Sequence, residues 1–404
     1  MTAVTEPDVR PGPIRRVVRG IVNGLSVLPG VGPAIYAIKD SLSEKQSGTY
    51  FVCNVAAWKQ PLLEAFLRNM GAPDVKFVSR KADRAVIRNQ FCGHRDSVIV
   101  IWGASEPVAL MSYVRRRGFR LWRMEDGFLR SRGLGAHHIP PASLILDKSG
   151  GIYFRADKPS DLEHFLSEHE FTEAELTLAS RFLQQIVSAN LTKYNLVEEA
   201  TDFHIDPSAR NILIFGQCED DQSIMHGSPE IKLNSHLIEK VIEEFPGASF
   251  YFRPHPDVTA GLRPELSDIS IYADRITIME GPYPVWENID LFDTVCVMTS
   301  LAGFEAIMRG KPVRTYGMPF YAGWGLTKDH ISCPRRSRKL SLEAVFYGAY
   351  IEAPTYISPE TGSPATLEAT LDSLGRIPRF EPSASLELDF DDNAGPADPR
   401  ASSS

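Results

Sequence analysis

Short apolar runs alternate with stretches of helical spacing through the first half of the chain. Runs rich in β-branched and aromatic residues predict strands, and residues 58–70 and 108–117 carry the spacing of amphipathic helices. Strands that alternate with helices in this way predict a parallel sheet with right-handed crossovers. The predicted strands of this half are 50–53, 97–102 and 119–122, followed by a strand pair within 140–154.

The second half repeats this alternation with strands of its own. Amphipathic stretches at 159–166 and 173–189 predict two helices that bridge the halves. Residues 234–245 predict a helix within the second half, and 341–350 predict a closing helix. Because 404 residues exceed the size of a usual single core, two packed α/β domains are expected. The predicted strands are 211–215, 248–252, 292–298 and 313–316.

The two arrays set the predicted domain boundaries, 49–195 for the first Rossmann-like domain and 196–378 for the second. Residues 379–404 are rich in acids, Ser, Pro and Gly without periodicity, which predicts a disordered tail. Residues 1–48 form a leader in which arginines precede a short apolar stretch broken by Pro and Gly. Such a leader either rests on an anionic membrane surface or docks on its own domain.

The composition narrows the class of protein. A net charge of −8 argues against a general nucleic-acid binder, whose affinity rests on neutralising phosphates. The five cysteines are scattered without a C-x-x-C pair, so neither a disulfide framework nor a zinc site is suggested, and a reducing cytoplasm is the default location. No apolar run reaches the length of a membrane span.

A polar cluster follows the predicted strand at 211–215. Gln217 comes shortly after it, and then three consecutive acids, Glu219, Asp220 and Asp221. Ligands of open α/β sheets bind beyond the carboxyl ends of the strands, so this cluster is a candidate site. The alternative is a solvated acidic turn after a core strand.

The next strand runs directly into Arg253, Pro254, His255 and Pro256. Two prolines around one histidine restrict the backbone and hold the ring at the end of the strand. This placement favours a functional histidine over a purely structural one.

A third strand turns into a helix at Thr299 and Ser300, either of which is a suitable N-cap. The free backbone N–H groups and the positive helix end, around Leu301, Ala302 and Glu305, would form a phosphate-binding site without a P-loop. The alternative is an ordinary capped helix.

In the first half, a loop at 123–135 follows the strand at 119–122. It combines glycines with two acids and with arginines that suit a carboxylate or a phosphate. A loop whose acids and arginines pair with one another is the alternative. The candidate side chains are Glu125, Asp126, Arg130 and Arg132.

With these residues in view, the chain resembles the bacterial capsular polysaccharide β-Kdo transferases, and is nearer to their carboxyl-terminal catalytic half. The matching segments run in the family's order from about residue 121 to 356. One departure is Arg253, where the family usually carries Lys. The segments include LWRMEDGFLRSRGLG, TKYNL, GQCEDDQSI, RPHPDV, MTSLAGFEAIMRGKPV and PFYAGWGLT.

The resemblance implies a GT-B-like α/β fold, in which 49–195 is the acceptor domain and 196–378 the donor domain. It implies CMP-Kdo as the donor and a retaining transfer to a Kdo-bearing glycolipid acceptor. The family's nucleophilic aspartate falls on Asp221, and its donor-site histidine falls on His255. The expected surroundings are the inner face of the cytoplasmic membrane, with other capsule biosynthesis or export proteins as partners and no nucleic acid.

The chemistry of retention agrees with this assignment, because two successive inversions through a covalent aspartyl intermediate retain the anomeric configuration. Glu125 or Asp126 is then the candidate general base, and the helix start at Ser300 the candidate phosphate site. No metal is expected to be required, because CMP is a stable leaving group. The candidates for the sugar carboxylate are Arg130, Arg132 and Arg253.

Two alternatives stay open. One is another GT-B sugar-nucleotide enzyme, a transferase or an epimerase that acts on a uridine nucleotide. The other is a non-catalytic subunit of a capsule synthesis or export complex that keeps a transferase fold. The joint presence of the three polar motifs favours an enzyme, since a degenerate module would be expected to have lost at least one of them.

Overall fold

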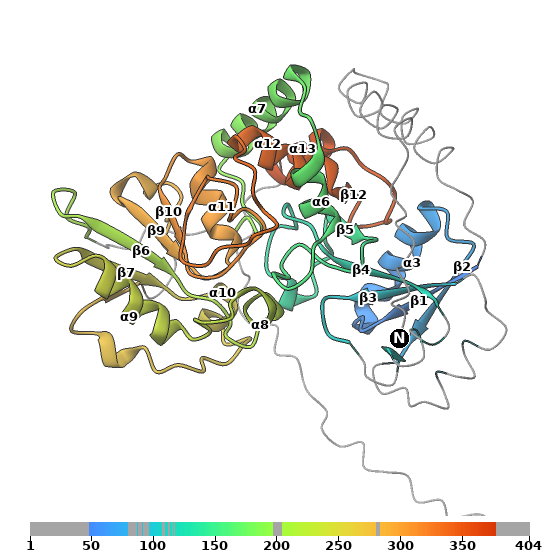
Figure 1. The fold of residues 1–404 in the computed structure, drawn as a ribbon, viewed down its shortest axis with the longest axis horizontal. Helices are drawn as coiled ribbons and strands as arrows, with labels where there is room; N and C mark the ends of the chain where they lie inside the picture. The colour runs from blue at the N-terminus through green and yellow to red at the C-terminus, as the bar shows by residue number, and fades with distance from the viewer. Residues whose placement is uncertain are drawn as a thin grey trace, which may run out of the picture.

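The computed structural model describes residues 48–376, apart from most of 80–96 and 107–117 and from 197–203 and 280–282. Within these residues the chain forms two six-stranded sheets, which Figure 1 shows as two lobes side by side. The predicted tail and all but the last residue of the predicted leader lie outside the described residues. The predicted two-domain α/β fold is confirmed.

The first sheet has the strand order β12-β5-β4-β3-β1-β2. Its first four strands along the chain pair in parallel, and β5 pairs antiparallel with both β4 and β12. The strands are β1 (Thr49–Cys53), β2 (Asp74–Val78), β3 (Val98–Trp102), β4 (Arg120–Asp126), β5 (Ser143–Asp147) and β12 (Pro354–Tyr356).

The prediction of a strand pair within 140–154 is wrong, because only β5 forms there. The Asp147 carboxylate accepts a hydrogen bond from the backbone N–H of Ser149, and Gly150 has a φ of 81°. The chain therefore turns away from the sheet directly after β5. The second neighbour of β5 is β12, from the far end of the chain.

The second sheet is entirely parallel, with the strand order β11-β10-β9-β6-β7-β8. All five residues of its central strand β6 are buried. Such continuous burial explains the unbroken apolar run that predicted this strand. The strands are β6 (Asn211–Phe215), β7 (Ser249–Arg253), β8 (Thr277–Ile278), β9 (Thr294–Val297), β10 (Val313–Thr315) and β11 (Lys328–Asp329).

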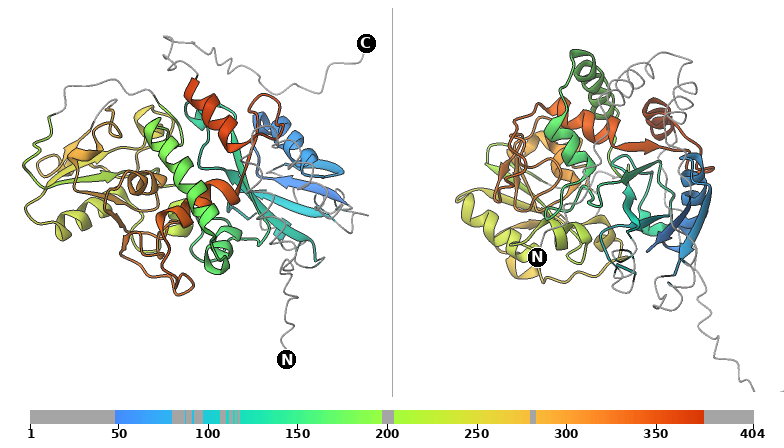
Figure 2. Two further views of the ribbon diagram at one scale, coloured as in Figure 1. Left: turned by 90° about the horizontal axis from the view of Figure 1, so that it is seen from above. Right: turned by 45° about the vertical axis from the view of Figure 1, so that its right-hand side comes forward.

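Helices cover the sheets and join the lobes. Thr172 and Glu175 form a capping box that starts α7, which packs against α12 and η5. Figure 2 shows the green helix α7 running between the two lobes, as predicted for residues 173–189. The helices are α3 (Gln60–Asn69), α6 (Asp161–Glu168), α7 (Glu173–Ser188), α8 (Gln222–Gly227), α9 (Asn234–Glu244), α10 (Pro256–Thr259), α11 (Leu301–Met308), α12 (Leu342–Phe346) and α13 (Leu367–Arg376). Short 3₁₀ turns are η1 (Ala57–Lys59), η2 (Gly135–His137), η3 (Ser270–Tyr272) and η4 (Ile289–Leu291), and η5 (Tyr347–Glu352) is a π-helix.

An aromatic cluster fixes the loop after β4 against the second lobe. The ring of Phe128 lies 4.4 Å from that of Phe320 and 5.7 Å from that of Tyr350. Phe304 of α11 lies 5.2 Å from Phe320. The loop that carries the first-half candidates therefore has a defined position relative to the second sheet.

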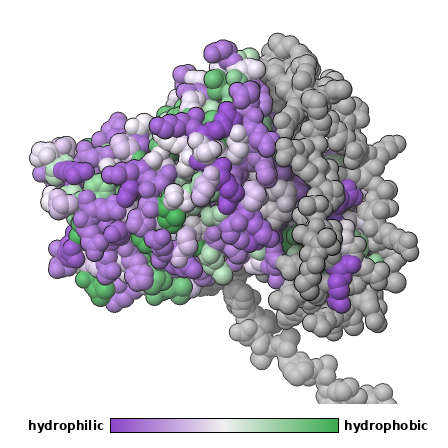
Figure 3. All heavy atoms as spheres, in the orientation of Figure 1, coloured by the Kyte–Doolittle hydropathy of each residue, from purple (hydrophilic) through white to green (hydrophobic). Residues whose placement is uncertain are grey.

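The last part of the chain returns to the first lobe. The predicted second domain, 196–378, contributes β12 to the first sheet, and the Asn69 side chain donates to the carbonyl of Gly362. Among the described helices, none has the length and apolar character needed to cross a membrane. The face of the second lobe in Figure 3 carries mostly hydrophilic residues, with apolar ones scattered among them.

Candidate active site

The carboxyl ends of β4, β6, β7 and β9 border one interlobe cleft with a cavity of about 450 Å³. Strand ends of parallel sheets are the usual ligand-binding edge of such folds. Both lobes contribute to its lining. Among the sequence-predicted candidates, Glu219, Asp220 and Arg130 do not line this cleft, whereas the others do. Those residues are Glu125, Asp126, Arg132, Gln217, Asp221, Arg253, His255, Pro256, Thr299, Ser300, Leu301, Ala302 and Glu305.

The three consecutive acids after β6 have three different environments. Glu219 is buried away from the cleft, where its carboxylate accepts from the backbone N–H of Asn234. Asp220 is exposed and pairs with Arg263. Of the three acids, Asp221 is the one that lines the cavity. Its geometry therefore distinguishes it from its neighbours, which the sequence pattern alone could not do.

Asp221 is the N-cap of α8 and its carboxylate is held at both oxygens. Oδ1 accepts from the backbone N–H of Gln222 at 2.8 Å, and Oδ2 accepts from the Ser223 hydroxyl at 2.7 Å. These bonds fix the orientation of the carboxylate relative to the cavity. A positioned carboxylate in a cleft can act as a nucleophile.

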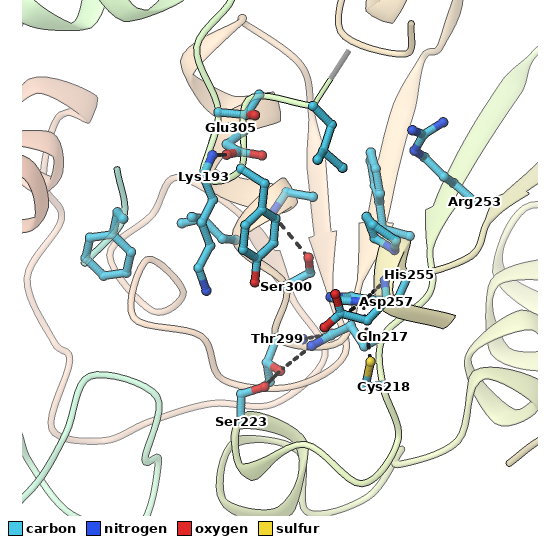
Figure 4. Close-up of a pocket in the computed structure, with 18 of the residues that line it drawn as sticks. Lys193, Gln217, Cys218, Ser223, Arg253, His255, Asp257, Thr299, Ser300 and Glu305 are labelled. Carbon is cyan, nitrogen blue, oxygen red and sulfur yellow. Dashed lines mark hydrogen bonds and ion pairs between the residues drawn. The ribbon is translucent and has the colours of Figure 1, made fainter. Parts of the chain in front are cut away.

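A hydrogen-bond network ties the ends of β6 and β9 together beneath the cavity (Figure 4). The Gln217 amide donates to the Thr299 hydroxyl at 3.0 Å and accepts from the Thr299 backbone N–H at 2.7 Å. Thr299 in turn contacts the Ser223 hydroxyl at 3.3 Å. Gln217 and Thr299 are both buried. They were predicted as site residues, and in the structure they support the Asp221 carboxylate through Ser223.

Ser300 is the N-cap of α11, and its hydroxyl accepts from the backbone N–H of Ala302 at 3.2 Å. The first residues of the helix, Leu301 and Ala302, line the cavity, so the positive end of the helix dipole faces it. This end can bind an anionic group. Glu305, one turn further along, is buried and accepts from the backbone N–H of Lys193.

His255 is held as a neutral ring. Its Nδ1 accepts from the backbone N–H of Asp257 at 3.1 Å, which leaves Nε2 as the protonated nitrogen. Burial lowers the pKa of His255, although the carboxylates of Asp257 and Asp221 oppose that shift. Arg253 donates to the carbonyl of Tyr283, and burial lowers the pKa of this guanidinium to about 10, which still leaves it charged at neutral pH.

Glu125 and Asp126 are adjacent but differ in charge environment. Asp126 accepts from Lys59 Nζ at 3.1 Å and from Arg130 Nε at 2.7 Å; although burial acts in the opposite direction, these cations lower its pKa. Burial and the charge of Asp126 raise the pKa of Glu125 to about 7, against the opposing effects of Lys59 and Lys193. Glu125 can therefore exchange a proton near neutral pH, whereas Asp126 stays ionised.

The arginines of the loop after β4 are engaged by the protein itself. Arg130 is buried behind Asp126 and also donates to the Ser131 hydroxyl. Arg132 lines the cavity, but its guanidinium donates to the carbonyl of Leu374 in α13. Asp126 and Arg130 thus pair with each other, as expected if the loop is not a ligand site. The adjacent Glu125 takes no part in this ion pair.

Sequence reasoning missed several residues of the cleft. They lie on the segment that connects the lobes, after β5, after β6 and in α8, after β7, and before η4. Lys193 and Tyr194 belong to the TKYNL segment, whose match to the transferase family was the one signal that pointed to them. The missed residues with polar or aromatic side chains are Tyr153, Lys193, Tyr194, Cys218, Ser223, Asp257, Arg263 and Trp286.

Cys218, His255 and Asp257 form, among the described residues, a group whose ligand atoms lie within 4.8 Å of one another, close enough for one metal ion. Two features oppose metal binding. Burial raises the pKa of the Cys218 thiol to about 12, and the His255 Nδ1 already accepts from Asp257 N–H. A metal would have to displace both that proton and that hydrogen bond.

Two facing Rossmann-type sheets with a polar cleft at their carboxyl edges define a GT-B-like α/β protein. The profile of the family described as "Capsule polysaccharide biosynthesis protein" matches residues 97–357, and the chain belongs to this family.

Related proteins share most of the chain. It is 38% identical to the lipopolysaccharide-processing protein LpsZ of Rhizobium meliloti, covering 82% of this chain and 75% of LpsZ. It is 37% identical to the capsule polysaccharide modification protein LipA of Neisseria meningitidis serogroup B, covering 79% of this chain but only 44% of LipA.

Solved structures agree with the fold and with the family. Two structures of Thermosulfurimonas dismutans KpsC are similar, one titled beta Kdo 2,4 transferase and the other beta Kdo 2,7 transferase. The first has a TM-score of 0.68 and 31% identity over 80% of this chain and 97% of that one. The second has a TM-score of 0.63 and 32% identity over 81% and 98%.

Proposed function

We propose that this protein is a retaining β-Kdo transferase, which moves Kdo from CMP-Kdo to a Kdo-bearing glycolipid during capsular polysaccharide synthesis. One observation carries the proposal: the two lobes bring a positioned carboxylate, Asp221, and a carboxyl group with a pKa of about 7, Glu125, to the same cavity. This chain is similar to two structures titled Kdo transferases over nearly their whole length, and this similarity supports Kdo as the transferred sugar.

The donor binds with its nucleotide on the second lobe. The N-terminus of α11 and the protonated Nε2 of His255 offer hydrogen-bond donors to the phosphate of CMP-Kdo. The cavity volume of about 450 Å³ lies in the range of small-molecule sites. Because CMP leaves with a single phosphate, neutral and cationic donors of the protein suffice, and no metal is required.

The transfer takes place in two steps. The Asp221 carboxylate attacks the anomeric carbon of Kdo, the bond between that carbon and the phosphate oxygen breaks, and CMP leaves with the electron pair. The acceptor hydroxyl then attacks the same carbon, gives its proton to Glu125, and releases Asp221 as a carboxylate. Each step inverts the anomeric centre, so the product retains the donor configuration.

The acceptor enters from the side of the first lobe, where Glu125 stands. Since the acceptor is lipid-linked, the protein works at the inner face of the cytoplasmic membrane. Other capsule biosynthesis proteins supply its substrate and consume its product.

Trapping of the covalent intermediate tests the function and the nucleophile together. The Asp221→Cys variant is incubated with CMP-Kdo and analysed by intact-protein and peptide mass spectrometry, with Asp220→Cys as the matched control. The proposal expects an adduct of one Kdo at position 221, joined through sulfur with release of CMP, and none at position 220. No Kdo transfer from CMP-Kdo by the wild type would refute the function. Transfer by the wild type without an adduct, or an adduct on both variants, would refute the assignment of the nucleophile.

A further inference from the structure

The segment that joins the lobes crosses the cleft as a strap, residues 191–196. On the side of the first lobe, the carbonyl of Lys193 accepts from the backbone N–H groups of Arg130 and Ser131, each at 3.2 Å. On the side of the second lobe, the backbone N–H of Lys193 donates to Glu305 of α11 at 2.8 Å. Both lobes therefore fix the backbone of this one residue.

The side chain of Lys193 extends from the strap into the cavity (Figure 4). Its Nζ lies 5.3 Å from the centre of the Tyr194 ring, and in the part of the chain that the structure describes no carboxylate forms a salt bridge with it. Although burial disfavours the charged form, nearby groups raise the pKa of Lys193, so the ammonium stays charged at neutral pH. These groups are Tyr194, Tyr153, Asp126 and Glu125.

A half-buried cation without a salt-bridge partner is costly unless a ligand supplies the negative charge. CMP-Kdo carries two anionic groups, the phosphate and the carboxylate of the sugar. The helix end at Ser300 and the ring of His255 offer the phosphate its partners on the second lobe. Lys193 instead interacts with Glu125 and Asp126 of the first lobe, where the sugar must meet the acceptor.

The arginines predicted for the sugar carboxylate have other partners. Arg130 pairs with Asp126, Arg132 donates to the carbonyl of Leu374, and Arg253 donates to the carbonyl of Tyr283. We propose that Lys193 binds the carboxylate of the donor sugar acid and so selects a sugar acid over a neutral sugar. This inference rests on the proposed function, because it takes CMP-Kdo as the donor.

The same ammonium acts on the proposed general base. The charged or titratable groups that face Glu125 are Asp126, which raises its pKa, and Lys59 and Lys193, which lower it, with Tyr153 alongside. Removal of the charge of Lys193 should therefore raise the pKa of Glu125. The rise of kcat/KM with pH, which needs Glu125 deprotonated, should move to higher pH.

Binding of CMP and of CMP-Kdo, measured by calorimetry with Asp221→Asn protein, which cannot form the glycosyl ester, separates the two anionic groups. The pH profiles are measured with Asp221 in place. Lys193→Met should weaken CMP-Kdo by about 10- to 100-fold, as expected for a lost charge-assisted hydrogen bond, and leave CMP nearly unchanged. Lys193→Arg, which keeps the charge, should retain most of the affinity and the wild-type pH profile. The matched control is Lys240→Met, at a partly exposed lysine of α9. It should change neither the affinity for CMP-Kdo nor the affinity for CMP.

Three results would overturn the inference: equal losses for CMP and CMP-Kdo, no loss for either, or an unshifted pH profile in Lys193→Met. Should Lys193→Met fail to fold, a Lys193→Arg variant that binds CMP-Kdo no better than CMP would also contradict it. If the wild type transfers no Kdo from CMP-Kdo, the proposed donor fails, whatever Lys193 does. The two failures are thus distinguishable.

Discussion

Replacement of Asp221 should separate catalysis from stability, because the carboxylate serves both. As N-cap of α8 it accepts from the Gln222 N–H, and as the proposed nucleophile it attacks the sugar. Asn is as good an N-cap as Asp, so Asp221→Asn should change the free energy of unfolding by less than about 0.5 kcal/mol. Asp221→Ala loses the cap and should cost about 1 kcal/mol.

The rate of transfer should not follow the stability of the two variants. Neither Asn nor Ala can form the glycosyl ester, so both variants should lose about 10⁴-fold or more of kcat, as expected for the removal of a nucleophile. The assay pairs steady-state release of CMP in the presence of acceptor with urea unfolding of each variant. Binding of CMP should persist in both.

Asp220→Asn is the matched control. Asp220 pairs with Arg263 at the surface, where such a pair contributes about 0–1 kcal/mol, and it is not among the residues that line the cavity. This variant should transfer Kdo at close to the wild-type rate. An Asp221→Asn variant that keeps more than about a hundredth of kcat, equivalent to a barrier increase below about 2.7 kcal/mol, would show that the nucleophile lies elsewhere.

Four further outcomes are expected. The kcat/KM of the wild type should rise with pH up to about 7, because Glu125 must be deprotonated to act as a base. Glu125→Gln should abolish this rise and slow transfer by about 10²- to 10⁴-fold. His255→Ala should raise the KM for CMP-Kdo, whereas an unchanged KM would remove this ring from the donor site. Activity should survive EDTA, and a loss that Zn²⁺ or Mg²⁺ restores would contradict the metal-free mechanism. Glu163→Gln should lower the free energy of unfolding by about 3 kcal/mol, because it leaves the buried Arg336 without its carboxylate partner. As a control, Glu64→Gln breaks the exposed pair with Arg68 and should lower the free energy of unfolding by less than about 0.5 kcal/mol.

The central strands and the residues at their ends could be predicted from the sequence because one local rule governs both. A fully buried strand needs an unbroken apolar run, and a parallel sheet exposes the carboxyl end of each strand at one edge. Hence the sequence predicts β6 and β7, the acidic cluster that contains Asp221 shortly after β6, and His255 shortly after β7. Figure 1 shows these strands side by side in the second lobe.

Contacts between distant segments could not be predicted in this way. The strand β12 has three residues, and its partner β5 lies more than two hundred residues earlier in the chain. Lys193 follows no apolar strand, and its place in the cleft depends on hydrogen bonds from both lobes. Neither feature has a local signature, since each exists only once the tertiary fold has formed.

The roles of Glu125 and Asp126 depend on tertiary contacts in the same way. Two adjacent acids on one strand end have equal standing in the sequence, but Lys59 and Arg130 both approach Asp126. Those cations keep Asp126 ionised, and burial of Glu125 together with the fixed negative charge of Asp126 raises the pKa of Glu125. In the proposed mechanism the ion pairs do more than hold the loop, because they keep Asp126 ionised and so hold a negative charge beside Glu125, the proposed general base. A raised pKa suits this role, because a carboxylate whose pKa lies near the working pH is a stronger base than one with its ordinary pKa.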